Sequence, residues 1–560
     1  MNDKETVSII PLSGVGDVTR NMYVYQYQNQ MLIVDCGLGF ADETMLGVDL
    51  LIPDITYLQN ALKSGKKIVG MLITHGHEDH MGALPFILPQ LLVDGVDFPI
   101  YATPFCAGLA NKKLQDFGVA KKIEAVPLES DHELHLGVFS AQFIRVTHSV
   151  VDTSHIFIRT PIGNFYHGSD FKIDPTPFDN KPTNKDKIKQ VGSQGILCLL
   201  SDCLGAERKG ATPSEATLTD FFVEEMKRTR GKFVVTTYSS NINRLNQVLK
   251  AAEALGKRVC FVGRSLIKTI EVAKQMGLVH MPKGMEIRVD QVKQQKDNQL
   301  VLFVAGSQGQ ENSALTRIAE GIHKEIKLNP QDTVVFSSDP IPGNEIMVNQ
   351  LIDTISRIGC NVVYSDIAHV HVSGHGSSDE LMELVEMTKP KKMLPIGGNF
   401  RHMVAYQKLA MEHGYKKEDV FLPDDGQEIV FSRNGAQLGK RFPVRHVYVD
   451  ELSGEEVESY VLRDRQRLSQ DGVVAIITEI DSENGRLVQK PNIILRGLSD
   501  ADSDVVVKEI QTDIQRLFAG KKGKVNNFVY IRKMIGQEIE QQLFRKYRKK
   551  PLILPIVIEV

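Results

Sequence analysis

The segment Thr74-His75-Gly76-His77-Glu78-Asp79-His80 directly follows an apolar run, residues 69–73, that is typical of a buried β-strand. Structural histidines are usually isolated and satisfied by one hydrogen bond, whereas several imidazoles and carboxylates close together are typical of a metal site. Gly76 is expected to let the backbone bend so that alternate side chains converge. The segment therefore predicts a divalent cation held at the end of a strand.

The residues before this segment predict a sheet. Residues 23–27 alternate in character, residues 28–30 offer a turn, and residues 31–34 continue as an apolar strand that ends at Asp35. This pattern indicates a β-hairpin. Asp35 is a second polar residue expected at a strand end.

Length and composition set the class of protein. A chain of 560 residues is expected to form roughly two to four domains. Its 66 Lys plus Arg nearly balance 69 Asp plus Glu, so any nucleic-acid contact must use a local patch. None of the six cysteines forms a C-x-x-C pair, which argues against a disulfide framework and favours a reducing cytoplasm. No apolar run approaches the roughly 18 residues of a membrane span, and secretion is not expected.

The middle of the chain predicts an α/β domain over residues 207–368. Strands are expected at residues 233–237, 259–262, 300–305 and 333–336, with a helix between the first two as in a βαβ unit. Their carboxyl ends carry loops such as Gly306-Ser307-Gln308-Gly309 and Ser337-Ser338-Asp339-Pro340, which are natural ligand sites.

The composition changes again near residue 450. An acidic stretch that includes Glu451, Glu455, Glu456 and Glu458 predicts a linker at residues 450–470. A compact α+β pattern then runs from about residue 473 to Val560.

The pattern H-x-H-x-D-H resembles the signature of the metallo-β-lactamase superfamily. Asp35 matches the acid that ends an early strand, His148 matches the third histidine, and Asp170 matches the aspartate that bridges two metals. The resemblance implies an αββα sandwich. It also implies two zinc ions, one held by His75, His77 and His148, the other by Asp79 and His80, with Asp170 shared. Such a pair, about 3.5 to 4 Å apart, suits hydrolysis of a phosphodiester.

Further motifs resemble ribonuclease J, a nucleic-acid-processing family that carries an inserted β-CASP domain. They are Ser201-Asp202, Glu207, Thr212-Pro213-Ser214-Glu215, Gly263-Arg264-Ser265, Gly306-Ser307-Gln308-Gly309, Pro340-Ile341-Pro342-Gly343-Asn344-Glu345, His371-Val372-Ser373-Gly374-His375-Gly376, Leu462-Arg463-Asp464-Arg465 and Lys550-Pro551-Leu552-Ile553-Leu554-Pro555. The match covers nearly the whole chain.

The resemblance predicts five parts. They are a metallo-β-lactamase domain in two segments, 1–206 and 369–449, a β-CASP insert at 207–368, the linker at 450–470, and a C-terminal α+β oligomerisation domain at 471–560.

The loop of residues 371–375 is the predicted substrate contact. Backbone amides and side chains of His371, Val372, Ser373, Gly374 and His375 in a glycine-bearing loop suit a phosphate. Asp79 and His375 are the candidate catalytic residues. His375 is expected to protonate the leaving 3′ oxygen, which requires a pKa near neutrality. A simple turn is the alternative for this loop.

Weaker candidates have structural alternatives of equal or greater weight. The loops 263–265 and 306–309 are as readily turns as phosphate contacts. The run Arg545-Lys546-Tyr547-Arg548-Lys549-Lys550 suits RNA, yet cations also favour a helix C-terminus. The resemblance further implies a structural calcium with Asp49 and Asp450 as ligands, although on sequence alone ordinary surface acids are the favoured explanation of both residues.

Three positions depart from the family pattern. Gly397, in Pro395-Ile396-Gly397-Gly398-Asn399, replaces the histidine that completes the second metal site; Asn243 replaces a histidine and Gly205 an asparagine. Losing even an outer partner of a metal site typically costs about 10- to 100-fold in affinity or activity. A weak second zinc site, with Mn²⁺ as a substitute, and low activity are therefore expected.

This combination resembles the second, weakly active ribonuclease J paralogue of bacteria that encode two. The preferred hypothesis is a cytoplasmic 5′-to-3′ exoribonuclease, with endonuclease activity as a further option, acting on 5′-monophosphorylated RNA in rRNA maturation and mRNA decay. The alternative is a largely non-catalytic subunit that activates a paralogue or belongs to an RNA degradosome; DNA processing is a weaker third. The expected partners are RNA, a second copy in a homodimer or homotetramer, and a ribonuclease J paralogue.

Overall fold

The computed structural model describes residues 5–42, 44–129, 131–341, 343–450, 454–497, 503–519 and 527–560. The chain divides into two compact units, Met1–Phe40 with Leu51–Val447, and Ala41–Leu50 with Tyr448–Val560. Each unit is described by itself.

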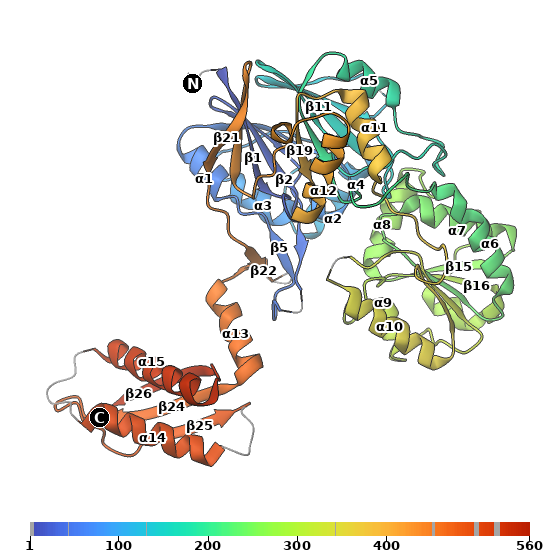
Figure 1. The fold of residues 1–560 in the computed structure, drawn as a ribbon. Helices are drawn as coiled ribbons and strands as arrows, with labels where there is room; N and C mark the ends of the chain where they lie inside the picture. The colour runs from blue at the N-terminus through green and yellow to red at the C-terminus, as the bar shows by residue number, and fades with distance from the viewer. Residues whose placement is uncertain are drawn as a thin grey trace. The chain divides into compact units, whose positions relative to one another are not determined.

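Two β-sheets share a hydrophobic core in the first unit (Figure 1). Phe165 joins the two layers, because its ring contacts Tyr25 at 5.8 Å and Phe431 at 5.1 Å between ring centroids. In sheet order, the eight-stranded sheet comprises β21 (Gly435–Arg441), β20 (Gln427–Ser432), β1 (Val7–Ser13), β2 (Met22–Tyr27), β3 (Gln30–Val34), β6 (Lys67–Ile73), β7 (Ile100–Ala102) and β8 (Glu124–Ala125). The six-stranded sheet comprises β19 (Lys392–Ile396), β13 (Ile196–Asp202), β12 (Gly163–His167), β11 (Ser154–Thr160), β10 (Phe139–Arg145) and β9 (Leu134–Leu136).

Helices complete this αββα sandwich, which confirms the predicted fold. Helix α11 packs against β13 and α5, while α1 packs against β6 and α4 against β7. The helices are α1 (Thr56–Lys63), α2 (Glu78–Met81), α3 (Leu84–Leu91), α4 (Pro104–Asp116), α5 (Lys185–Gly192), α11 (Ser378–Thr388) and α12 (Phe400–Glu412). Four short strands come between the longer elements in sequence order: β4 (Gly39–Phe40), β5 (Leu50–Ile52), β22 (Val447–Val449) and β23 (Glu456–Val457).

Adjacent parallel strands bring distant residues to one edge of the six-stranded sheet. Strand β13 pairs in parallel with β12 and with β19, and Asp202 lies opposite Ile396. Because the carboxyl ends of parallel strands meet at one edge, the residues after β12, β13 and β19 gather there. The chain leaves for the insert after β13 and returns before β19.

The insert is a parallel five-stranded sheet with a hydrophobic core on each face. Its strand order is β15-β16-β14-β17-β18, so the predicted βαβ partners β14 and β15 are separated by β16. The strands are β14 (Phe233–Thr236), β15 (Arg258–Val262), β16 (Leu300–Val304), β17 (Thr333–Phe336) and β18 (Asn361–Val363). The helices are α6 (Leu218–Arg228), α7 (Ile242–Ala254), α8 (Arg264–Gln275), α9 (Ala314–Ala319) and α10 (Glu345–Ile358). All five strands fall inside the predicted 207–368 range.

The second unit is a small α+β fold. Strand β24 pairs with antiparallel β25 and parallel β26, and an apolar core joins this sheet to α14 and α15. Its elements are α13 (Ser459–Asp471), β24 (Val473–Ile480), β25 (Asn492–Arg496), α14 (Ser503–Ala519), α15 (Phe528–Tyr547) and β26 (Leu552–Glu559). Helix α13 occupies much of the predicted linker, of which residues 451–453 lie outside the described residues. The predicted domain boundaries stay predictions.

Two expectations from composition can be compared with the structure. All six cysteines are buried free thiols. Among the residues that the structure describes, no helix has the length and apolarity needed to cross a membrane.

Candidate metal centre

The histidine-rich segment follows β6 as predicted. His77 keeps an extended backbone with ψ of 153° and is the N-cap of α2, so the chain turns into a helix just after it. Glu78 and Asp79 occupy the first helical turn, where the helix dipole favours negative charge. His148 follows β10 and Asp170 follows β12. Side chains from both sheets therefore meet at one end of the sandwich.

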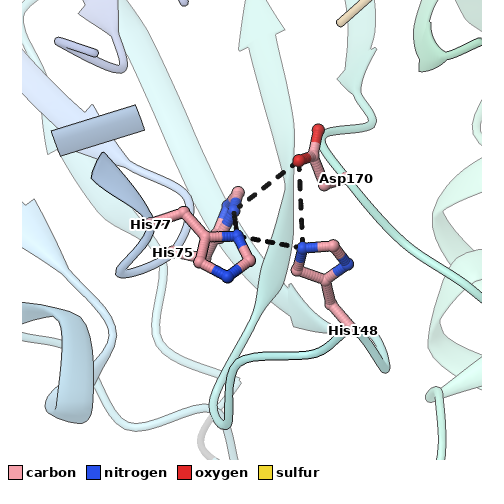
Figure 2. Close-up of side chains that lie close together, drawn as sticks. All are labelled: His75, His77, His148 and Asp170. Carbon is pink, nitrogen blue, oxygen red and sulfur yellow. Dashed lines mark hydrogen bonds and ion pairs between the residues drawn. The ribbon is translucent and has the colours of Figure 1, made fainter. Parts of the chain in front are cut away.

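Three imidazoles and one carboxylate converge in a first cluster (Figure 2). His77 Nδ1 lies 3.1 Å from both His75 Nε2 and His148 Nε2. Asp170 Oδ2 lies 3.8 Å from each of the same two Nε2 atoms. A tetrahedral zinc ion with ligands at about 2.0 to 2.1 Å requires donor separations of about 3.3 Å. The cluster therefore has the size and donor types of a four-ligand zinc site.

The charge states in this cluster also suit a cation. Burial lowers the pKa of His75, His77 and His148, to about 3 for His77, so these rings are neutral with free lone pairs. Burial opposes ionisation of Asp170, but His80 and His375 hold the pKa of this carboxyl well below its usual value. Neutral imidazoles beside a carboxylate are the donors that zinc binds.

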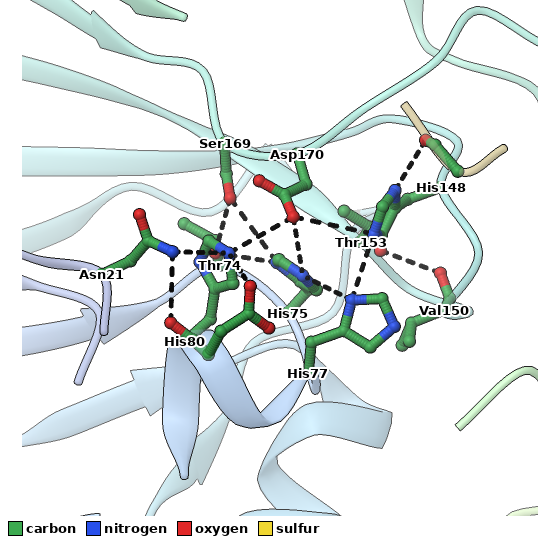
Figure 3. A network of polar contacts seen from close by, with 12 residues as sticks. Asn21, Thr74, His75, His77, His80, His148, Val150, Thr153, Ser169 and Asp170 are labelled. Atoms are coloured by element: carbon green, nitrogen blue, oxygen red, sulfur yellow. Dashed lines mark hydrogen bonds and ion pairs between the residues drawn. The ribbon is translucent and has the colours of Figure 1, made fainter. Parts of the chain in front are cut away.

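Asp79, His80 and Asp170 form a second, smaller cluster. Figure 3 shows His80 and Asp170 of this cluster. His80 Nε2 lies 3.3 Å from Asp170 Oδ2 and 3.6 Å from Asp79 Oδ2. Burial raises the pKa of Asp79 to about 6, with His80 opposing the shift. Burial lowers the pKa of His80, but Asp170, Asp79 and Asp35 together raise it well above its ordinary value. Asn21 Nδ2 lies 3.2 Å from His80 Nε2, a contact that no local sequence pattern indicates.

Hydrogen bonds to residues outside the two clusters orient the imidazole rings of His80 and His148. His80 Nδ1 donates to Asp35 Oδ2 at 2.7 Å, and His148 Nδ1 donates to the Gly374 carbonyl at 2.7 Å. Each bond leaves Nε2 directed toward the cluster, as partners of this kind do in metal sites. Asp35 is fully buried and also accepts from Thr74 N and Oγ1. Asp35, the acid expected at the end of β3, thus orients the imidazole of His80.

The chain bends at Gly76, as predicted, between β6 and α2. This bend does not use the left-handed conformation, because Gly76 is not among the described glycines with positive φ. A Cβ at this position would lie 3.0 Å from Leu109 Cδ1. Packing against α4 favours a small residue at position 76, and His75 and His77 converge through the strand-to-helix turn.

The 371–375 loop lies beside the first cluster. The His375 ring contacts the His148 ring at 5.1 Å, and its Nε2 lies 3.9 Å from Asp170 Oδ2. Gly374 packs so closely that a Cβ would lie 2.7 Å from His148 Cε1. Val372 is only 2% exposed and packs in the core of the insert, so its side chain does not face a substrate. Ser373 Oγ accepts from the His375 amide.

His375 has a higher pKa than predicted. Its Nδ1 donates to Asp202 Oδ2 at 2.7 Å. Burial lowers the pKa of His375, but Asp202 and Asp170 outweigh this effect and raise it to about 9 instead of a value near neutrality. The imidazole is therefore protonated at neutral pH, as a proton donor must be.

The three departures from the family pattern have different surroundings. Gly397 follows β19 with φ of +64°, and a Cβ there would lie 3.4 Å from Asp170 Oδ1. Gly205 lies against the 371–376 loop, because a Cβ would meet the Gly376 carbonyl oxygen at 1.8 Å. Asn243 is 7% exposed within α7. Only position 397 borders the second cluster.

The weaker candidates have structural roles in the described residues. Gln308 donates to Asp339 O and accepts from Ile341 N, which ties two strand-end loops together; Pro342 lies outside the described residues. Gly263, with φ of +114°, is the N-cap of α8. In the basic run, Lys546 pairs with Glu509 and Lys549 with Asp471.

Asp49 and Asp450 lie on neighbouring segments of the second unit. Asp49 N donates to Val449 O at 3.3 Å. Within the described part of the chain, the clusters of three or more potential ligands include neither aspartate.

Comparison with known proteins bears on the whole chain. Residues 15–165 match the metallo-β-lactamase superfamily, residues 230–355 the β-CASP domain of ribonuclease J, residues 361–423 the Zn-dependent metallo-hydrolase RNA specificity domain, and residues 460–560 the ribonuclease J C-terminal domain. The chain is 32% identical to ribonuclease J2 of Bacillus subtilis over 99% of both chains. The chain belongs to the ribonuclease J family.

Other members of the family agree. Ribonuclease J of Thermus thermophilus is 34% identical over 99% of this chain and 96% of its own length, and ribonuclease J 1 of Streptococcus pyogenes is 33% identical over 99% and 97%. A solved Enterococcus faecalis protein of unknown function shares the fold, with a TM-score of 0.52 and 14% identity over 76% of this chain and all of its own. Ribonuclease J is a family of zinc-dependent hydrolytic ribonucleases, and the His/Asp clusters are the candidate metal sites of this member.

Proposed function

We propose that this chain is a 5′-to-3′ exoribonuclease, with endonuclease activity as a further option, that acts on 5′-monophosphorylated RNA in rRNA maturation and mRNA decay. The convergence of His75, His77, His148 and Asp170, with donor separations of 3.1 to 3.8 Å, carries the proposal. Asp79 and His80 would hold a second ion that shares Asp170. Two such ions supply a nucleophilic hydroxide and stabilise charge on a phosphodiester.

The chain's own residues would then bind the RNA and protonate the leaving oxygen. The loop of His371, Val372, Ser373, Gly374 and His375 would contact RNA phosphates with its polar groups, which are only partly buried at His371, Ser373 and His375. His375, held by Asp202, would donate its proton to the leaving 3′ oxygen. Asp79, beside His80, would act as the second catalytic residue at the metal centre. The contact between the His375 and His148 rings supports an arrangement in which proton donor and metal ligands act on one phosphate.

Slow turnover follows from Gly397. The second cluster offers only Asp79, His80 and Asp170, since position 397 has no side chain to donate. A site that lacks one ligand is expected to bind its ion about 10- to 100-fold more weakly. Mn²⁺ is expected to substitute for zinc there. A structural Ca²⁺ at Asp49 and Asp450 stays a prediction.

Mononucleotide release from 5′-monophosphorylated RNA, with Zn²⁺ or Mn²⁺ present, tests the proposal. His77→Ala is expected to abolish the release, whereas His135→Ala, at an exposed residue of β9, is the matched control and should keep the wild-type rate. If His77→Ala proceeds at the wild-type rate, a contaminant is responsible and the proposal fails.

The vacant ligand position favours a second candidate, a largely non-catalytic subunit in the cytoplasm. Such a chain would assemble as a homodimer or homotetramer, or with a ribonuclease J paralogue in an RNA degradosome. Metal analysis and paralogue pull-down separate the two functions. A chain with no bound zinc that raises the activity of a paralogue would be a scaffold; a metal-loaded chain that degrades RNA alone would be the enzyme.

A further inference from the structure

A buried ion pair lies in the insert, just before α6 and on α7. Arg244, on α7, is 0% exposed, and Glu215, just before α6, is 3% exposed. The guanidinium contacts both carboxylate oxygens, with Nη2 at 3.0 Å from Oε1 and 2.8 Å from Oε2, and Nε at 3.2 Å from Oε2. Burial raises the pKa of Glu215, but Arg244 and Lys172 together lower it below its usual value. Both groups are therefore charged and satisfied.

The other side of the guanidinium reaches the 371–375 loop. Arg244 Nη1 donates to Ser337 O at 2.9 Å and to Ser337 Oγ at 2.6 Å, and Ser337 Oγ in turn donates to Val370 O at 2.6 Å. The same Nη1 lies 3.5 Å from His371 Nδ1. One side chain thus joins the end of β17 to the first residues of the loop.

Glu215 links this pair to the strand end that carries Asp170. The Glu215 amide donates to Asp174 Oδ2 at 2.9 Å. Lys172, 1% exposed, places its ammonium 3.7 Å from Glu215 Oε1 and 3.6 Å from Asp174 Oδ2. Lys172 comes two residues after Asp170 in the chain. The contacts run without a break from the candidate metal cluster to the candidate phosphate loop.

Stability alone does not explain such an arrangement. Replacing a buried ion pair by apolar residues is often neutral or stabilising, so the pair is weak evidence for a stabilising role. Its geometry is specific, however, because only the planar fork of arginine can contact Glu215 and Ser337 together. A lysine would keep the charge beside Glu215 and lose the second contact.

We propose that Arg244 is a positioning residue, which holds Ser337 and His371 so that the 371–375 loop presents its polar groups to RNA beside the candidate metal centre. This inference rests on the proposed function, since it requires that the loop binds RNA. Arg244 acts through His371 and does not itself touch the substrate.

A double-mutant cycle between Arg244→Lys and His371→Ala tests the inference. Binding of a short, fluorescent 5′-monophosphorylated RNA is measured by anisotropy in EDTA, so that no cleavage interferes. Arg244→Lys and His371→Ala are each expected to weaken binding about tenfold, and the double variant to bind no more weakly than His371→Ala alone. Arg228→Lys, at a side chain of α6 that is 74% exposed, is the matched control and should bind as wild type.

Ser337→Ala keeps the inference testable if Arg244→Lys does not fold. It leaves the Arg244–Glu215 pair intact and removes the hydroxyl that contacts Val370, so it too should weaken RNA binding. Under metal-loaded turnover, both variants should raise KM more than they lower kcat. If His371→Ala weakens binding while Ser337→Ala and Arg244→Lys do not, or if the losses add, the positioning role is overturned and the proposed function stands. If His371→Ala binds RNA as wild type, the RNA contact assigned to the loop fails, and the inference falls with it.

Discussion

Replacing Gly397 by histidine should restore a ligand to the second cluster. A Cβ at this position lies 3.4 Å from Asp170 Oδ1, so an imidazole attached to it can reach the space between Asp79, His80 and Asp170. A new metal ligand is expected to raise affinity by at least about 10- to 100-fold, which corresponds to about 1.4 to 2.7 kcal/mol.

Backbone strain has a separate effect on stability. Gly397 has φ of +64°, and a residue with a Cβ pays roughly 1 to 2 kcal/mol in that region. The folded variant carries this strain with and without the ion, so the strain does not reduce the gain in second-site affinity. It lowers the stability of the metal-free variant instead.

Gly397→Ala is the matched control, because it introduces the same strain without an imidazole. Zinc stoichiometry at defined free zinc, with thermal melting in EDTA and in zinc, measures both effects. Both variants should melt below wild type in EDTA, and only Gly397→His should regain stability and bind a second ion more tightly than Gly397→Ala. Equal second-site affinity in the two variants would refute the reasoning, since the imidazole would then not reach the ion.

Three further results are expected. Asp35→Asn removes the carboxylate that accepts from His80 Nδ1, so metal affinity should fall about 10- to 100-fold in a competition assay with a chelator. Phe165→Ala creates a cavity between the two sheets at a fully buried ring and should cost about 3 to 5 kcal/mol in denaturant unfolding of the first unit. Burial raises the pKa of Asp425 to about 7, so between about pH 4 and pH 7 the folded state holds a proton that the unfolded state has lost. The free energy of unfolding therefore falls as pH rises from about 4 to 7. Asp425→Asn should narrow the difference in melting temperature between pH 5 and pH 8.

Local pattern was enough to predict the strands that carry the metal cluster. The predicted hairpin became β2 and β3, and the apolar run before Thr74 became β6, because alternation and β-branched content depend on neighbouring residues alone. The dense His/Asp segment likewise indicated a cation without further context. The resemblance to the metallo-β-lactamase superfamily supplied His148 and Asp170, which no local spacing connects to His75.

Local sequence pattern did not predict the features that depend on contacts between residues far apart in the chain. Strand β16 separates β14 from β15, and the sequence of a βαβ unit does not determine which strands become neighbours. The pKa expected for His375 is near neutrality, whereas the structure raises it to about 9. The cause is Asp202, which is 173 residues away in the chain but 2.7 Å away in space. Arg244 and Asn21 gave no signal, because a single polar residue on a helix or in a loop resembles a surface residue until its partners are known. Glu215 belongs to a motif that resembles ribonuclease J, but its partner Arg244 could not be identified from the sequence.

The sequence by itself determined the strands of the β2–β3 hairpin and β6, and that a segment of candidate metal ligands follows β6, because backbone sterics and side-chain alternation act over a few residues. Only the tertiary structure decided which donors face one another, that position 397 borders Asp170, and how Arg244 reaches the 371–375 loop. The packing of two sheets and the return of the chain from the insert bring these groups together, and no short stretch of sequence contains that information.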